Sequence, residues 1–191
     1  MTILVTTSRH PNPRLRTFVK DLASALPNAV YINRGKLNID ELAAEGYRRG
    51  SEVIVIVGRG WYGNPGRIVF MHIYEDRFEF YPLIIRVRGV KLVREMSDAK
   101  SIRVTDEVIS YFPNDEVEEF ALALGEALKI PTFRLSSIED LKGVSSATLL
   151  IEREPRKDVA FIMKFISLKE WIMIGPIIKV KRVVYKCPST T

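Results

Sequence analysis

The chain contains two pairs of similar segments, and the members of each pair lie about 95 residues apart. Ser51-Glu-Val-Ile-Val-Ile-Val resembles Ser146-Ala-Thr-Leu-Leu-Ile-Glu, and Tyr81-Pro-Leu-Ile-Ile-Arg-Val-Arg resembles Gly175-Pro-Ile-Ile-Lys-Val-Lys-Arg. A repeat of this length is too long for one unit of a solenoid. It predicts an internal duplication, with two similar α/β halves at about 1–95 and 96–191 within a single domain.

In the first half, capping signals and apolar runs predict strands and helices in alternation. Asn12 is placed to cap a helix whose first residue is Pro13, where a missing N–H costs nothing. Asn38 is placed to cap a second helix, and Glu41 completes a capping box. Runs rich in apolar residues predict strands at 2–6, 30–32, 53–57, 67–74 and 78–88.

The second half is expected to repeat this order. A helix is predicted over 115–129, a helical turn at 137–141, and strands at 132–135, 147–152, 159–166 and 170–185. If the halves are equivalent, Pro82 and Pro176 begin matching strands. The two longer helices then press Phe18 and Phe120 into mixed sheets with separate cores.

The charge is positive and unevenly distributed. The net charge is +6 and the isoelectric point is near 9.5. Basic residues gather between Met1 and Lys36 and again after Pro176, whereas six acids and no base lie between Asp106 and Glu119. Segregated positive charge favours a polyanionic partner, and the acidic stretch suits a protein partner instead.

Gly58-Arg-Gly60-Trp-Tyr-Gly63 matches the G-x-G-x-x-G pattern of dinucleotide sites. That fingerprint requires a helix to begin there, so that its N-terminal amides face a pyrophosphate. Here Asn64-Pro65-Gly66 leads directly into a predicted strand, which indicates a glycine-rich hairpin loop. Arginines beside Trp61 and Tyr62 would suit the binding of unpaired bases.

No residue pattern indicates catalysis, a metal or a cofactor. His10 and His72 are the only histidines, and neither lies at metal-ligand spacing from cysteines or acids. The only cysteine, Cys187, has no local partner for nucleophilic work. Neither a signal peptide nor a membrane span is expected. We therefore expect a cytoplasmic protein that is not an enzyme and has no membrane partner.

Four motifs, in order along the chain, resemble the Brix-domain family of ribosome-biogenesis proteins, and the compact archaeal type in particular. The first is the Thr-Ser-Arg-His-Pro-Asn-Pro loop that starts at Thr7 and precedes a helix. The second is the turn Asn33-Arg34-Gly35. The others are Gly63-Asn-Pro-Gly-Arg-Ile-Val-Phe and Ile174-Gly-Pro-Ile-Ile-Lys-Val.

The resemblance implies a duplicated α/β fold in which each half is similar to the anticodon-binding domain of class IIa aminoacyl-tRNA synthetases. It also implies a non-catalytic part in the processing of ribosomal RNA or the assembly of a ribosomal subunit. The expected partners are ribosomal RNA or its precursor, together with ribosomal proteins or other assembly factors.

The hypothesis from the sequence is that basic side chains hold RNA phosphates and that the glycine-rich loop contacts bases. The alternative is a protein-docking module for another assembly factor or ribosomal protein, and a more distant one is a nucleotide-dependent enzyme. The candidate RNA-binding residues are Arg9, Arg14, Arg16, Lys20, Arg34, Lys36, Arg59, Trp61, Tyr62, Arg67, Lys179, Lys181 and Arg182.

Overall fold

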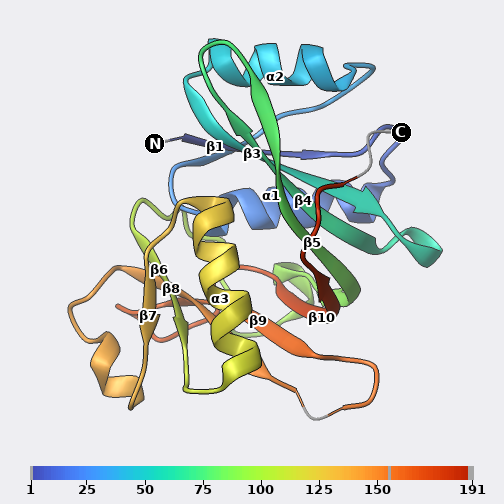
Figure 1. The fold of residues 1–191 in the computed structure, drawn as a ribbon. Coiled ribbons are helices and arrows are strands. Elements are labelled where there is room, and N and C mark those ends of the chain that lie inside the picture. Colours follow the sequence, from blue (N-terminus) through green and yellow to red (C-terminus); the bar gives the residue numbers. More distant parts are fainter. Residues whose placement is uncertain (1, 155, 189–191) are drawn as a thin grey trace.

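The computed structural model describes residues 2–154 and 156–188, and these residues form one ten-stranded mixed sheet flanked by helices (Figure 1). Along the chain the elements are β1 (Thr2–Thr7), α1 (Pro13–Ala25), β2 (Ala29–Tyr31), α2 (Ile39–Arg48), β3 (Ser51–Arg59), the single-turn 3-10 helix η1 (Trp61–Gly63), β4 (Pro65–Ile73), β5 (Phe78–Lys91), η2 (Val93–Glu95), β6 (Glu107–Tyr111), α3 (Asp115–Leu128), β7 (Thr132–Arg134), η3 (Ile138–Leu141), β8 (Ala147–Arg153), β9 (Phe161–Ser167) and β10 (Ile177–Val184). None of the helices in these residues is long and apolar enough to cross a membrane.

The strand order is β2-β1-β3-β4-β5-β10-β9-β8-β6-β7. Read inward from either edge, each half has two parallel pairs followed by two antiparallel pairs. The expectation of separate mixed sheets is wrong, because β5 pairs with β4 on one side and with β10 on the other (Figure 1). Superposition of the halves, and their likeness to an anticodon-binding domain, stay predictions.

One face of the sheet is covered by α1 and α3 together. Phe18 of α1 and Phe120 of α3 are fully buried in the same hydrophobic cluster, which also contains Val55 of β3 and Leu149 of β8. The expectation of a separate core for each half is therefore wrong. Because the sheet is continuous across β5 and β10, the apolar faces of both halves join beneath the two helices.

The opposite face carries two smaller clusters, one near each edge. α2 packs Leu42 against β3 and β4 in the first half, and Leu141 of η3 packs near Leu150 of β8 in the second. Between these clusters lie the parts of β4, β5 and β10 that contain Arg67, Arg86 and Arg182, and these three residues belong to neither cluster. The centre of the sheet is therefore open on the α2 side.

Several helix signals in the sequence are confirmed. Asn12 caps α1 by accepting from the backbone N–H of Leu15, and Pro13 is the first helical residue. Asn38 and Glu41 form the expected capping box at the start of α2.

One strand was not predicted from the sequence, and two predicted strand starts are wrong. β6 was not predicted, since it starts with the acid Glu107 and is defined by pairing with β7 and β8. The strand expected from Glu170 begins only at Ile177, because the preceding residues turn and Trp171 has a φ of 56°. Pro82 lies inside β5, at an irregularity in the pairing with β4, where its missing N–H is tolerated.

Candidate nucleic-acid interface

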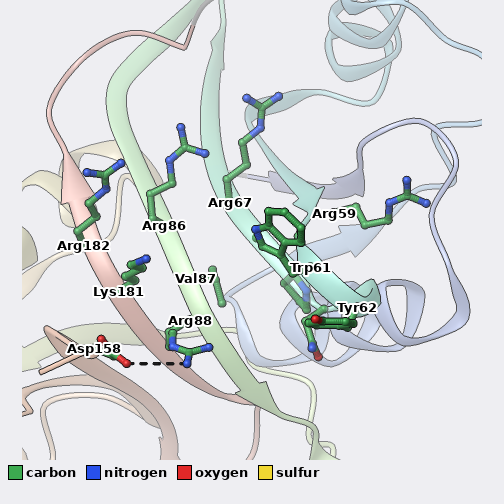
Figure 2. Close-up of a pocket in the computed structure, with 14 residues that line it drawn as sticks. Arg59, Trp61, Tyr62, Arg67, Arg86, Val87, Arg88, Asp158, Lys181 and Arg182 are labelled. Carbon is green, nitrogen blue, oxygen red and sulfur yellow. Dashed lines mark ion pairs between the residues drawn. The ribbon is translucent and has the colours of Figure 1, made fainter. Parts of the chain in front are cut away.

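A groove with a volume of about 800 Å³ lies over the open centre of the sheet, and most of its charged side chains are basic (Figure 2). It brings together the glycine-rich loop of the first half and the C-terminal strand of the second. Its lining residues that bear on RNA binding are Arg59, Trp61, Tyr62, Arg67, Arg86, Arg88, Asp158, Lys181 and Arg182.

Three arginines lie directly opposite one another on adjacent strands. In the strand register, Arg67 of β4 faces Arg86 of β5, and Arg86 faces Arg182 of β10. Figure 2 shows the three side chains side by side and extending in the same direction. We call these three residues the arginine row. Gly58 pairs with Arg67 and leaves space for it, because a Cβ at Gly58 would lie 2.8 Å from Arg67 Cγ.

The arginine row has no counter-charge within the described residues. Arg67, Arg86 and Arg182 form no ion pair there, and Arg86 Nε is buried without a hydrogen-bond partner. Like charges placed directly across neighbouring strands destabilise a sheet, and an unpaired buried N–H costs about 1–3 kcal/mol. A bound anion would remove both costs.

β-Bulges bring further cations to the same groove. The pairing of β10 with β5 skips Lys181, so that Lys181 and Arg182 both line the groove although they are adjacent in sequence. Arg88 is skipped in the same way on β5 and also lines the groove, where it forms a long ion pair of 3.9 Å with Asp158 (Figure 2). Asp158 is the one acid among the described lining residues.

The glycine-rich loop holds two aromatic side chains in solvent. Trp61 is 87% exposed and Tyr62 is 97% exposed, with Tyr62 in the left-handed region at a φ of 52°. Gly60 and Gly66 close the base of the loop, because a Cβ at Gly66 would lie 2.5 Å from Gly60 Cα. Left-handed backbone at a bulky residue is strained, so contacts elsewhere in the loop must hold it.

The start of α1 braces this loop. Asn12 Nδ2 donates to the Gly63 carbonyl at 2.9 Å, and Arg14 Nε donates to Asn64 Oδ1 at 2.9 Å. The rest of the Arg14 guanidinium pairs with both carboxylate oxygens of Glu95, and this hydrogen bonding raises the pKa of Arg14. Arg14 is thus already used within the protein, although the sequence placed it among the candidates for RNA contact.

The other candidates lie outside the groove lining. Arg34 is buried and donates to the Leu37 carbonyl, and burial followed by the nearby charge of Arg9 lowers its pKa. Lys20 lies over the Tyr31 ring, with 5.7 Å from Nζ to the ring centroid. The remaining exposed candidates are Arg9, Arg16, Lys36 and Lys179. Arg59, by contrast, lines the groove, but Figure 2 shows its side chain pointing away from the arginine row.

Sequence reasoning missed Arg86 and Arg88, which together with Lys181 supply the centre of the groove. The signal was present as the alternation Arg86-Val-Arg88 at the end of an apolar run, which is typical of a strand with one open face. The run was interpreted only as part of the repeat.

The other interpretations of the sequence were a protein-docking surface, which the acidic stretch would suit, and a nucleotide-dependent enzyme. The structure supports them less than it supports RNA binding. The glycine pattern is followed by η1 and then by β4, so the helix needed for a dinucleotide site does not begin there. In the acidic stretch, Asp106 accepts from Ser145 and Ser146, Glu107 is buried, and Glu116 pairs with Arg153. The described residues contain no group of His, Cys, Asp and Glu that could hold a metal ion.

No protein-family model matches the chain, whereas curated proteins do. A probable Brix domain-containing ribosomal biogenesis protein from Pyrococcus abyssi is 32% identical over 189 residues, covering 94% of this chain and 83% of the relative. A protein with the same description from Methanopyrus kandleri is 32% identical over 161 residues, covering 80% and 81%. The chain belongs to the Brix-domain family.

Solved structures agree with this membership. The crystal structure of a probable ribosomal biogenesis protein from Aeropyrum pernix matches this Brix-domain chain with a TM-score of 0.77 at 29% identity, covering 99% of this chain and 97% of the other. An archaeal Imp4-like protein shares the fold, with a TM-score of 0.66 at 18% identity. The family resemblance predicted from the motifs is confirmed, and none of these names indicates a catalytic activity.

Two motifs that carried the Brix-domain resemblance meet in the structure. The loop before α1 supplies Asn12 and Arg14, which hold Gly63 and Asn64 of the glycine-rich loop. The sequence separation is about 50 residues in both contacts. The motifs therefore build one surface, with the aromatic side chains at its tip and the arginine row beside it.

Proposed function

We propose that this protein acts in ribosome biogenesis without catalysis, by binding ribosomal RNA or its precursor in the groove over β4, β5 and β10. The arginine row is the observation that carries the proposal. A chain of phosphates supplies negative charge at regular intervals, and guanidinium groups bind phosphates through paired hydrogen bonds. The names of the relatives support the biological setting.

RNA also fits the mixture of side chains around the arginine row. Phosphate contacts hold a nucleic acid in place, and contacts with bases add selectivity. The groove offers cations for the first purpose and exposed aromatic rings for the second.

The proposal predicts that the triple variant Arg67→Ala, Arg86→Ala, Arg182→Ala binds ribosomal RNA weakly and with a flatter salt dependence. Fluorescence anisotropy with labelled fragments of ribosomal RNA, repeated from low to high salt, measures both quantities. Loss of three phosphate contacts should reduce the slope of log K against log salt by about 2. The variant should remain folded, because it removes like charges that face one another.

A matched control removes three positive charges elsewhere, with Arg48→Ala, Lys142→Ala and Lys169→Ala. These residues lie at the end of α2, after η3 and after β9, and none lines the groove. The control should keep nearly the slope of the unaltered protein. Equal slopes for the two triple variants would contradict the proposal, because binding would then depend on net charge alone.

A further inference from the structure

Resting on the proposed function, we infer that the groove takes an unpaired RNA strand, with a base stacked on Trp61 or Tyr62 and the following phosphates on the arginine row. The groove therefore selects single-stranded segments over double helix. Two features of the site distinguish a single strand from a duplex: the exposure of the rings and the constrained backbone of the loop that carries them. The arginine row supplies the phosphate contacts.

Trp61 and Tyr62 are exposed far more than their chemistry favours. Large aromatic rings normally bury most of their surface, and adjacent exposed ones mark a binding surface. Neither ring belongs to a hydrophobic cluster of the described chain, and their carbon atoms face the groove or solvent. Stacking with a base would cover that apolar surface, and every base has a face that can stack.

The backbone of the loop that carries the two rings is held by several contacts. Its base is closed where Gly60 meets Gly66, the Gly60 N–H donates to the Asn64 carbonyl at 2.7 Å, and Asn12 holds the Gly63 carbonyl. Tyr62 keeps its left-handed backbone under these constraints. Because this backbone is ordered before binding, stacking of a base has to order only the two side chains and not the loop.

The arginine row has the width of a short stretch of single strand. Neighbouring strands lie about 4.8 Å apart, so the row from β4 to β10 spans about 10 Å. In a double helix each strand carries one phosphate about every 3.4 Å of the axis, so a row of this length spans about three phosphates of one strand. The row therefore fits one strand of either form, and the rings distinguish the two. In a double helix the bases are already stacked on one another, and only groove edges and the backbone are accessible to protein. A duplex could contact the arginines but would leave the two rings unused.

The experiment compares a labelled ten-nucleotide uridine-rich RNA with the same RNA annealed to its complement. Binding to the full chain is measured by anisotropy at one salt concentration and then across a salt series. The single strand should bind at least about tenfold more tightly than the duplex. In the double variant Trp61→Ala, Tyr62→Ala, the affinity for the single strand should fall about tenfold or more while the duplex affinity stays the same.

The salt dependence separates stacking from charge. The aromatic variant should keep the salt slope of the unaltered protein, since it removes no charge, whereas the arginine-row variant should lose slope with either RNA. Trp171→Ala is the matched control, because Trp171 is also exposed, at 47%, but does not line the groove. Trp171→Ala should change neither the affinity for either RNA nor the preference for the single strand.

Failure of the inference and failure of the proposed function give different results. Equal affinity for single strand and duplex, both weakened by the arginine-row variant, would overturn the inference and leave the proposed function standing. A preference for the single strand that persists in the variant Trp61→Ala, Tyr62→Ala would also overturn the inference. A third result would overturn both the inference and the proposed function. In it, the arginine-row variant still binds both RNAs as tightly as the unaltered protein does, whereas the unaltered protein binds polyglutamate tightly and the variant does not. That result would indicate an acidic protein partner.

Discussion

Replacing Phe18 or Phe120 with alanine is expected to lower the free energy of unfolding by about 3–5 kcal/mol in each case. Both side chains are fully buried, Phe18 beneath α1 and Phe120 beneath α3, where its ring centroid lies 5.1 Å from that of Phe161. Truncation of a large ring removes its burial and leaves a cavity that the surrounding close-packed residues cannot fill. Urea unfolding of the two variants and the unaltered protein measures the loss.

The shared core adds a second expectation for the same variants. Because α1 and α3 pack on one continuous sheet, Phe18→Ala should reduce the protection of backbone amides in β8 as much as in β3. Native-state hydrogen exchange at Val55 and Leu149 reports on the two strands. Loss of protection at Val55 alone would show that the halves unfold separately and would contradict the single core.

Replacing Glu107 with leucine is expected to stabilise the protein at neutral pH by about 1–3 kcal/mol or more. Glu107 begins β6, is 3% exposed, and has no hydrogen-bond partner for either carboxylate oxygen among the described residues. Burial, followed by the nearby charge of Asp106, raises the pKa of Glu107 well above its ordinary value. At pH values between the unfolded and the folded pKa of Glu107, the folded state therefore binds a proton that the unfolded chain releases.

The sign of the pH dependence follows from this raised pKa. The stability linked to the Glu107 proton is complete below the unfolded pKa and is lost as the pH rises through the folded pKa. Urea unfolding between pH 5 and 8.5 should show the stability difference between Glu107→Leu and the unaltered protein widening with pH. Glu75→Leu, at an exposed turn, serves as the control and should run parallel to the unaltered protein. A constant difference for Glu107→Leu would contradict the assignment.

Features that depend only on neighbouring residues were predicted well from the sequence. The caps at Asn12 and Asn38 depend only on neighbouring residues, and the structure confirms both. The strand after the glycine-rich loop was predicted from the turn residues Asn64-Pro65-Gly66, and β4 begins there. The same turn residues predicted that a strand, and not a long helix, follows Gly63, and the structure has β4 from Pro65.

Pairing between distant strands determined what the sequence did not predict. β6 gains its structure from β7 and β8, and the charged Glu107 at its start conceals it in the sequence. The arginine row depends on the register of three strands, of which β10 comes about 90 residues after β5. Lys181 and Arg182 would point to opposite faces in a regular strand, and only the bulge against β5 brings both to the groove.

Some candidates from the sequence became part of the scaffold for a similar reason. Arg14 and Arg34 were selected for their charge and for their place in a basic segment. In the structure Glu95 and the carbonyl of Leu37 engage them, and neither partner is identifiable as such from the sequence. Charge clustering located the basic regions, but the tertiary contacts decide which cations face the groove.

The most direct test of the account is to map where ribosomal RNA touches the protein. Purified protein bound to ribosomal RNA is irradiated with ultraviolet light, the RNA and protein are digested, and the crosslinked peptides are identified by mass spectrometry. We expect crosslinks at Trp61 and Tyr62 and in the part of β5 that contains Arg86, and we expect their loss in the arginine-row variant. Crosslinks confined to α3 and the second-half edge of the sheet, with the groove unmodified, would contradict it.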